Sequence, residues 1–228
     1  MEMAVIELRD AWAIARKDLR VELRSRVLTN QIAPYTLLIM VLFGFALDAD
    51  TQTLRDTGPG LFWVAVLLIA LLAIQRAGQI EDNDGARERI LLTPVSPPSI
   101  FLGKSIALFL QLLSLEILLF FVMLALFDLS VDNPLLICLS AVIATIGVAT
   151  SGTLYGVITA GVGVRETLLP ILLLPVLAPI AIGATRVFGD AFGRVEADGW
   201  AWLGLLAVFA VVYTVLGMFA YGELVEDT

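Results

Sequence analysis

Six apolar stretches follow one another along the chain, separated by polar segments, and each is long enough, or nearly so, to cross a membrane. A helix needs about 20 residues to span a hydrocarbon core of roughly 30 Å. The pattern predicts spans at residues 28–47, 60–74, 100–127, 135–160, 167–188 and 200–221. The second is short and is expected to continue toward Gly78, and the third is long, so its start is expected in the interface. The pattern therefore predicts an all-α integral membrane protein.

The order of these stretches predicts a single membrane domain over residues 1–228. Its expected parts are an N-terminal helix at 1–27, two spans at 28–77, a polar loop at 78–99, four spans at 100–222 and an acidic tail at 223–228. The first residues lack the short apolar core and small-residue cleavage site of a signal peptide. The first helix is therefore expected to stay with the domain.

Residues before the first span repeat with a helical period. Apolar side chains recur at three- and four-residue steps, and charges fill the other face; the apolar positions are Val5, Leu8, Trp12, Ala15, Leu19, Leu23 and Val27. Such a helix suits a membrane interface, with its axis in the membrane plane. A soluble helix packed on a partner protein is the alternative that the pattern leaves open.

Composition narrows the function further. The chain is 59% hydrophobic and 16% charged, more apolar than a soluble domain of 228 residues can enclose. Its single cysteine, Cys138, excludes an internal disulfide and a zinc site built from cysteines. The absence of histidine removes the commonest metal ligand, haem ligand and general acid–base group. The net charge of −8 comes with no basic stripe, so nucleic acid is not an expected partner.

Basic residues are distributed unevenly between the two sides. Eleven of the fourteen lie on the side of the N-terminus, and Arg55, Arg186 and Arg194 lie on the other. Loops rich in lysine and arginine stay in the cytoplasm. We therefore expect a multi-pass protein of the cytoplasmic (inner) membrane with both termini in the cytoplasm.

The polar loop after the second span carries most of the remaining charge. An acidic cluster at residues 81–84 falls at the predicted first turn of a helix, where carboxylates interact favourably with the helix dipole. This helix would run to about Leu92 before Pro94 ends it. A short charged helix between two spans suits docking into a groove of another protein. A solvated connector is the other interpretation of the same residues.

The order of motifs in and after this loop resembles that of a known family. The run Glu81…Gly85…Glu88…Leu91-Leu92-Thr93-Pro94-Val95-Ser96…Gly103-Lys104 resembles the cytoplasmic loop of ABC-2 type permeases, which couples to an ATPase subunit. Within that group the chain resembles the heme exporter protein B family, the membrane subunit used in cytochrome c maturation. Further similar stretches are Arg16–Arg24, Phe101–Lys104, Gly147…Leu154, Arg165…Pro179 and Tyr221…Asp227. Gln75, Gly78 and Ala210 depart from the family pattern.

The resemblance implies a permease subunit rather than an enzyme. It implies a cytoplasmic ABC ATPase that holds the ATP, a second permease copy, other cytochrome c maturation membrane proteins with a haem chaperone, and the lipid bilayer as partners. It places coupling to the ATPase at Glu81, Asp84, Gly85, Glu88, Leu91, Leu92, Pro94 and Ser96. Haem would be the cargo of the complex, and no cofactor would be bound directly. An ABC-2 permease for a lipid, glycan or drug is the alternative.

The sequence contains no nucleotide-binding loop, which is consistent with an ATPase on another subunit. No G-x-x-x-x-G-K-[ST] loop is present, because Pro98 stands where the glycine upstream of Gly103-Lys104-Ser105 would be. A secondary transporter that uses Lys104 and Glu116 as coupling residues would need no ATPase, but such proteins are typically built from repeats. The two halves of this chain show no convincing repeat.

Three polar residues fall in the third predicted span: Lys104, Gln111 and Glu116. An ionisable group at mid-bilayer costs roughly 2.5–3.5 kcal/mol on insertion scales, so it usually faces a partner or a cavity. Glu116 is interpreted either as a residue of a cargo path or subunit contact, or as a carboxyl that holds the bundle together. Lys104 is expected to extend toward the headgroups.

The fifth predicted span contains three prolines, Pro170, Pro175 and Pro179. Each proline removes a backbone donor and bends a helix, which membranes tolerate when neighbours satisfy the freed carbonyls. The prolines are therefore hinge candidates for alternating access, or they give the helix a curved fit to its neighbours.

Overall fold

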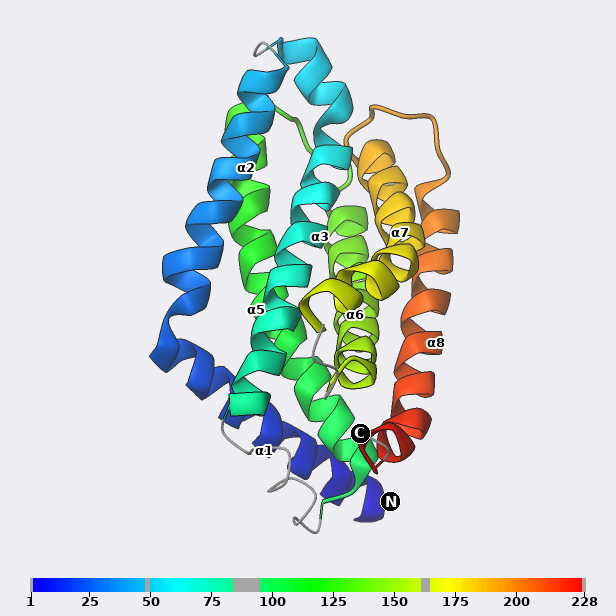
Figure 1. Cartoon of the computed structure of the whole chain (residues 1–228). Coiled ribbons are helices and arrows are strands. Elements are labelled where there is room, and N and C mark those ends of the chain that lie inside the picture. Colours follow the sequence, from blue (N-terminus) through cyan, green and yellow to red (C-terminus); the bar gives the residue numbers. More distant parts are fainter. Residues whose placement is uncertain (1, 48–49, 84–94, 161–164, 227–228) are drawn as a thin grey trace.

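The computed structural model describes residues 2–47, 50–83, 95–160 and 165–226, and these residues are almost entirely helical, with no strand among them (Figure 1). The elements in chain order are α1 (Glu2–Ser25), the π-helical segment η1 (Leu28–Ile32), α2 (Ala33–Ala46), α3 (Thr51–Asn83), α5 (Pro97–Phe127), α6 (Pro134–Ile158), α7 (Arg165–Ala191) and α8 (Gly199–Glu226). The predicted all-α membrane class is confirmed.

Six helical segments of the described chain are long and apolar enough to cross a membrane. They are Leu28–Ala46, Gln52–Gln79, Pro97–Phe127, Pro134–Ile158, Glu166–Ala191 and Gly199–Val225. Each predicted span falls on one of them. The second is far longer than predicted, because α3 carries polar residues at both ends and hydropathy detects only the part of a helix that matches the hydrocarbon core.

The spans alternate in direction along the bundle (Figure 1). Helix α1 lies across one end of the bundle, where the start of α5 and the end of α8 also lie; we call this the basal end and the opposite one the distal end. Helices α3 and α6 are central, since 61% of the most apolar stretch of each is buried, against 22% for α2 and for α8. The outer faces of α2 and α8 are thus available to lipid or to a partner.

Helix α1 contacts α5 with a face that overlaps the predicted apolar one only in part, at Ala15. Ala11 and Ala15 are fully buried, and Glu22 is 8% exposed, whereas Leu8 and Trp12 are 61% and 54% exposed. Small residues allow two helix backbones to approach closely. The docking face is therefore built on alanines, and Leu8, Trp12 and Leu23 of the predicted apolar face stay exposed.

Helix α7 is continuous through Pro170, Pro175 and Pro179 but is bent. Its first part crosses the bundle obliquely, and the remainder turns toward the distal end (Figure 1). Prolines prevent the regular backbone ladder and are the usual cause of such bends. Their role as a hinge stays a prediction.

Candidate functional site

Two of the predicted coupling residues, Glu81 and Ser96, belong to the described parts of the chain, at the end of α3 and just before α5. Asp84, Gly85, Glu88, Leu91, Leu92 and Pro94 lie outside the described residues, and so does most of the predicted short helix. The backbone of Glu81 belongs to α3, which runs to Asn83. The prediction that residues 81–83 begin a separate helix is therefore wrong: they are the last residues of α3, beyond the second span. No glycine or proline interrupts the chain from Gln79 to Asn83, so the helix continues, and the acidic residues sit at the end that the helix dipole disfavours.

Ser96 stands at the boundary of α5. Its backbone is extended (φ −65°, ψ 140°), and Pro97 follows at the first helical position, where a missing N–H costs nothing. The Ser96 and Ser99 hydroxyl oxygens lie 2.8 Å apart. The predicted coupling segment thus leads directly into the rigid start of α5.

Gly103 is the point where α5 touches α1. A Cβ atom at this position would lie 2.6 Å from the carbonyl oxygen of Ala11 and 2.7 Å from the Cβ of Ile14. Neither atom can move without moving α1 itself. The glycine in the Phe101–Lys104 stretch is therefore required by the close approach of two helices.

Phe101, two residues earlier, makes the matching contact with α8. Its ring lies against Gly217 so closely that a Cβ there would overlap it, and its centroid is 5.7 Å from that of Tyr221. Phe101 is fully buried. We call Ala11, Phe101, Gly103, Gly217 and Tyr221 the basal junction, because they join α1, α5 and α8.

Glu22 fixes the joint between α1 and the first span. The backbone N–H of Leu28 donates to its Oε1 (2.7 Å), and the Ser25 hydroxyl donates to its backbone carbonyl (3.0 Å). Arg26 adopts a positive φ of 55° in between. A carboxylate that accepts a backbone hydrogen bond caps a helix start, so Glu22 stabilises the change of direction from α1 into η1. Sequence reasoning missed this role, since the partner lies six residues away across a bend.

Helices α3 and α7 are joined by amide side chains near the same end. Gln75 Nε2 donates to the backbone carbonyl of Glu166 (3.3 Å), and Gln79 Nε2 donates to its carboxylate (3.5 Å). The end of the second span is thus tied to the start of the bent helix.

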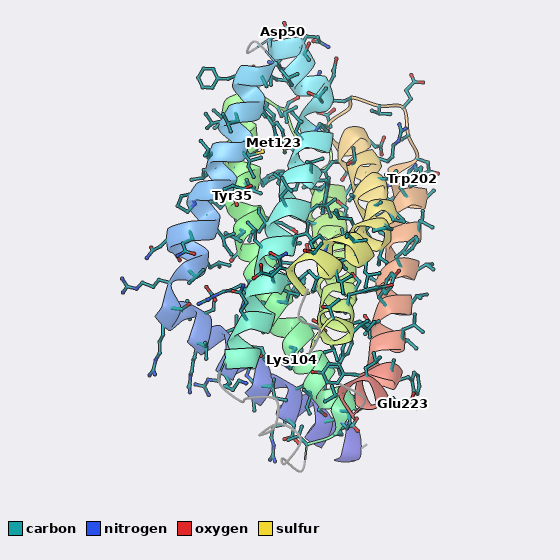
Figure 2. The ribbon with its side chains drawn as sticks, in the orientation of Figure 1. Tyr35, Asp50, Lys104, Met123, Trp202 and Glu223 are labelled. Carbon is teal, nitrogen blue, oxygen red and sulfur yellow. The ribbon has the colours of Figure 1, made fainter. Side chains whose placement is uncertain are left out.

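The three polar residues of α5 have different surroundings. Lys104 is 8% exposed and lies toward the basal end (Figure 2); its extension toward the headgroups stays a prediction. Gln111 is half-buried. The structure does not bring the three together on one path, because they are spread over more than three turns of one helix.

Glu116 is enclosed between α5 and α6. It is 3% exposed, and the Thr145 hydroxyl oxygen lies 2.8 Å and 2.7 Å from its two carboxyl oxygens and 2.6 Å from the carbonyl oxygen of Ala141. A hydroxyl carries one hydrogen, so it cannot satisfy three acceptors, whereas a neutral carboxyl supplies a second hydrogen. The geometry favours the interpretation that Glu116 holds the bundle together.

The distal end is stabilised by capping side chains and an ion pair. Asp50 accepts from the backbone N–H of Thr53 at the start of α3 (2.8 Å), and hydrogen bonds from Thr53 lower the pKa of Asp50. Asn133 caps α6 through Leu136 N (3.1 Å), and Asp198 caps α8 through Ala201 N (3.1 Å). Arg55 pairs with Asp128. Polar residues directly before apolar runs are the signal that predicts such caps.

A cluster of aromatic rings fills the interior toward the distal end. It joins three helices through edge-to-face and stacked contacts among Phe62, Trp63, Phe120, Phe188 and Phe192. All but Phe120 are 1% exposed. We call these residues the distal aromatic cluster.

Metal binding has no support in the part of the chain that the structure describes. No group of three or more histidine, cysteine or acidic side chains is positioned there to hold a metal ion. Cys138 is exposed on α6. The polar side-chain interactions found among the described residues lie within helices, cap them or join one helix to another.

Six helices of this length and apolarity place the chain in the class of multi-pass helical membrane proteins. The comparison with known families is specific: the chain belongs to the CcmB protein family, whose model matches residues 9–227.

Individual relatives agree with this family. Heme exporter protein B of Haemophilus influenzae is 30% identical over 213 residues, which cover 87% of this chain and 90% of that protein. The Pseudomonas aeruginosa protein of the same name is 28% identical over 84% of this chain and 86% of its own length. The match to heme exporter protein B of Escherichia coli K12, at 33% identity, spans less than half of either chain (42% and 44%).

Proposed function

We propose that this chain is the membrane subunit of an ABC-type exporter complex used in cytochrome c maturation. A separate ATPase subunit hydrolyses ATP, and this subunit couples the hydrolysis to delivery of haem, or to release of a haem chaperone, on the outer face of the membrane. The observation that carries the proposal is the family match over residues 9–227. It is supported by relatives named heme exporter protein B, which align with this chain over most of their length.

In this proposal the basal end faces the cytoplasm. Arg9, Arg16, Lys17, Arg20 and Arg24 lie on α1, which crosses that end (Figure 1). Basic residues near span ends are retained on the cytoplasmic side. The ATPase therefore meets the segment between α3 and α5, and both termini lie beside it in the cytoplasm of a cell with an inner membrane.

The coupling residues proposed for this contact are Glu81, Asp84, Gly85, Glu88, Leu91, Leu92, Pro94 and Ser96. The basal junction supports this assignment, because the segment that ends at Ser96 continues into α5, and Phe101 and Gly103 follow within about two helical turns. A displacement of the start of α5 would act on α1 through Gly103 and on α8 through Phe101. Movement imposed by the ATPase would thus reach three helices at once.

Partner proteins hold the haem in this proposal. Histidine is absent from the sequence, and histidine is the commonest axial ligand of haem iron. A second copy of this chain, other maturation membrane proteins and the haem chaperone complete the complex. Stoichiometric haem binding by the purified subunit alone would contradict this division of labour.

Purification in mild detergent tests the coupling assignment. The double charge reversal Glu81→Lys/Asp84→Lys should reduce the ATPase recovered with the subunit while membrane insertion stays normal. The matched control is Asp56→Lys/Glu196→Lys, which reverses two acidic residues of the distal end, and it should leave recovery unchanged. Equal recovery from both variants would show that the coupling residues lie elsewhere.

The proteins recovered with the ATPase test the cargo. Cytochrome c maturation proteins among them support haem delivery. Proteins of envelope synthesis or drug resistance would instead identify an ABC-2 permease that exports a lipid, glycan or drug, and would overturn the haem proposal while leaving the ATPase coupling intact.

A further inference from the structure

Helix α1 presents two uncovered ridges beside the face that docks on α5. The first is apolar and consists of Leu8, Trp12 and Leu23, which are 61%, 54% and 76% exposed. The second, which we call the basic ridge, consists of Arg9, Arg16, Lys17, Arg20 and Arg24. Since these positions repeat at helical spacing, each ridge runs along the helix and borders the other.

The basic ridge is open to an anionic ligand. The side chains of Arg9, Trp12, Ala13, Arg16, Lys17, Arg20, Val21 and Arg24 line a hollow of about 560 Å³. Among the described residues, Lys17 is the member of the ridge that pairs with a carboxylate, Asp18, at 3.0 Å. Within the described part of the chain, the arginines of the ridge therefore have no carboxylate partner, although Glu7 and Asp10 lie on the same helix.

The position of α1 restricts what that partner can be. The helix is followed at once by η1 and α2, which form the first span, so α1 lies close to a membrane boundary. Exposed tryptophan and leucine beside a row of arginines is the arrangement of helices that lie in the headgroup region. A purely aqueous position would leave the apolar ridge in water.

We propose that the basic ridge binds the headgroups of anionic phospholipids while Leu8, Trp12 and Leu23 insert among the adjacent acyl chains. The lipid phosphate groups supply the negative charge that complements these arginines. An arginine binds a phosphate through paired hydrogen bonds. Because α1 is held on α5 at Gly103, lipid bound at the ridge also fixes the start of α5. The proposal rests on the basal end lying at a membrane surface and does not require the ATPase.

Native mass spectrometry of the full chain, extracted from bilayers of mixed phosphatidylcholine and phosphatidylglycerol, tests the binding. The wild-type chain should retain phosphatidylglycerol in excess over its share of the bilayer. The triple variant Arg16→Gln/Arg20→Gln/Arg24→Gln should lose this preference, by about fivefold for each arginine removed. The matched variant with lysine at the three positions should retain most of it, and Arg186→Gln at the distal end should change nothing.

A label on the ridge checks that the lipid binds at this place. Ala13 is exposed within the ridge, so Ala13→Cys in a Cys138→Ser background accepts a fluorophore there. Spin-labelled phosphatidylglycerol in nanodiscs should quench it more than spin-labelled phosphatidylcholine, and the difference should fall with added salt. Equal quenching by the two lipids would overturn the proposal.

An acidic protein surface is the competing occupant. If the triple glutamine variant keeps its phosphatidylglycerol preference but no longer recovers the ATPase, the basic ridge binds protein and the lipid proposal is wrong. If instead the lipid preference is lost and the ATPase is still recovered, lipid binding stands independently of the proposed coupling.

Discussion

The two ends of the bundle are held together by different kinds of contact. At the distal end, side chains cap α3, α6 and α8, and the backbone N–H groups of Asp132 and Asn133 both donate to the carbonyl of Ala191 (3.1 Å and 3.0 Å). At the basal end, α1, α5 and α8 meet through Gly103 and Gly217. Hydrogen bonds also occur near the basal end, at Glu22 and Gln75, but the junction of α1, α5 and α8 is formed by close contacts at its two glycines.

The difference indicates which end can move. A hydrogen bond weakens steeply when its angle changes, so the distal caps and turns fix the positions of the helix ends. Contacts between a glycine and an aromatic ring have no preferred direction along the helix, so small displacements cost little until atoms collide. In the proposed coupling, the basal end, where the coupling segment enters, is the end that we expect to be displaced.

The largest effect should come from the distal aromatic cluster. Phe188→Ala removes a ring that contacts four others and leaves a cavity, with an expected loss of about 3–5 kcal/mol in the free energy of unfolding. Denaturant titration in detergent measures it. Phe219→Ala is the matched control, because Phe219 is 82% exposed and its loss should be far smaller. Equal losses would show that the cluster does not anchor the distal half.

A glycine substitution tests the basal junction. Gly217→Ala places a methyl group into the Phe101 ring, and overpacking of this kind costs about 1–3 kcal/mol. Gly204→Ala on the same helix has no heavy atom within 4 Å of the new carbon and should be neutral or stabilising. The thermal midpoint of each variant gives the measurement. Phe101→Leu added to Gly217→Ala should restore part of the loss; no restoration would mean that the strain lies elsewhere.

A threonine substitution tests the contact between α5 and α6. Thr145→Val removes the hydroxyl beside the Glu116 carboxyl, and an unsatisfied buried polar group costs about 1–3 kcal/mol. Thr153→Val is the control, since its hydroxyl bonds only the carbonyl of Ala149 within α6 (2.8 Å). Glu116→Gln should preserve stability and complex assembly. Loss of function with normal stability in Glu116→Gln would instead support a role of the carboxyl in a cargo path.

The smallest effect should be the pH dependence of the Asp50 cap. Because the folded-state pKa of Asp50 is lowered, its carboxylate stabilises the folded chain above its unfolded pKa, and the contribution is lost as pH falls through the folded one. Asp50→Ala should therefore lower the thermal midpoint slightly at neutral pH and not at low pH. Asp56→Ala, in the same helix, serves as the control. A difference that grows toward low pH would contradict the capping role.

The sequence predicts the spans well because hydropathy reports directly on the solvent of each segment. It predicts helix ends less well: polar residues such as Gln52 and Gln79 continue α3 beyond the hydrocarbon core, and the acidic residues at 81–83 end this helix rather than begin another. Acidic residues mark the first turn of a helix only where no helix is already in progress, and here α3 continues to Asn83.

The basal junction could not be predicted from the sequence, although some of its residues belong to stretches that resemble the family. Phe101 and Gly103 stand in a stretch that resembles the family, but the reason for the glycine lies in Ala11 and the reason for the ring contact lies in Gly217. These partners are distant in sequence, and nothing in local periodicity relates them. The docking of α1 on α5 could not be predicted for the same reason, since alanines give a weak hydropathy signal and a close helix contact needs small residues.

The contact between Glu116 and Thr145 also constrains how the protein is made. Thr145 follows Glu116 by 29 residues, so the ribosome delivers the carboxyl to the membrane before its partner has been synthesised. A lone α5 would carry an unpaired polar group into lipid. We therefore expect α5 and α6 to enter the bilayer together as a hairpin, in which the carboxyl and the hydroxyl meet.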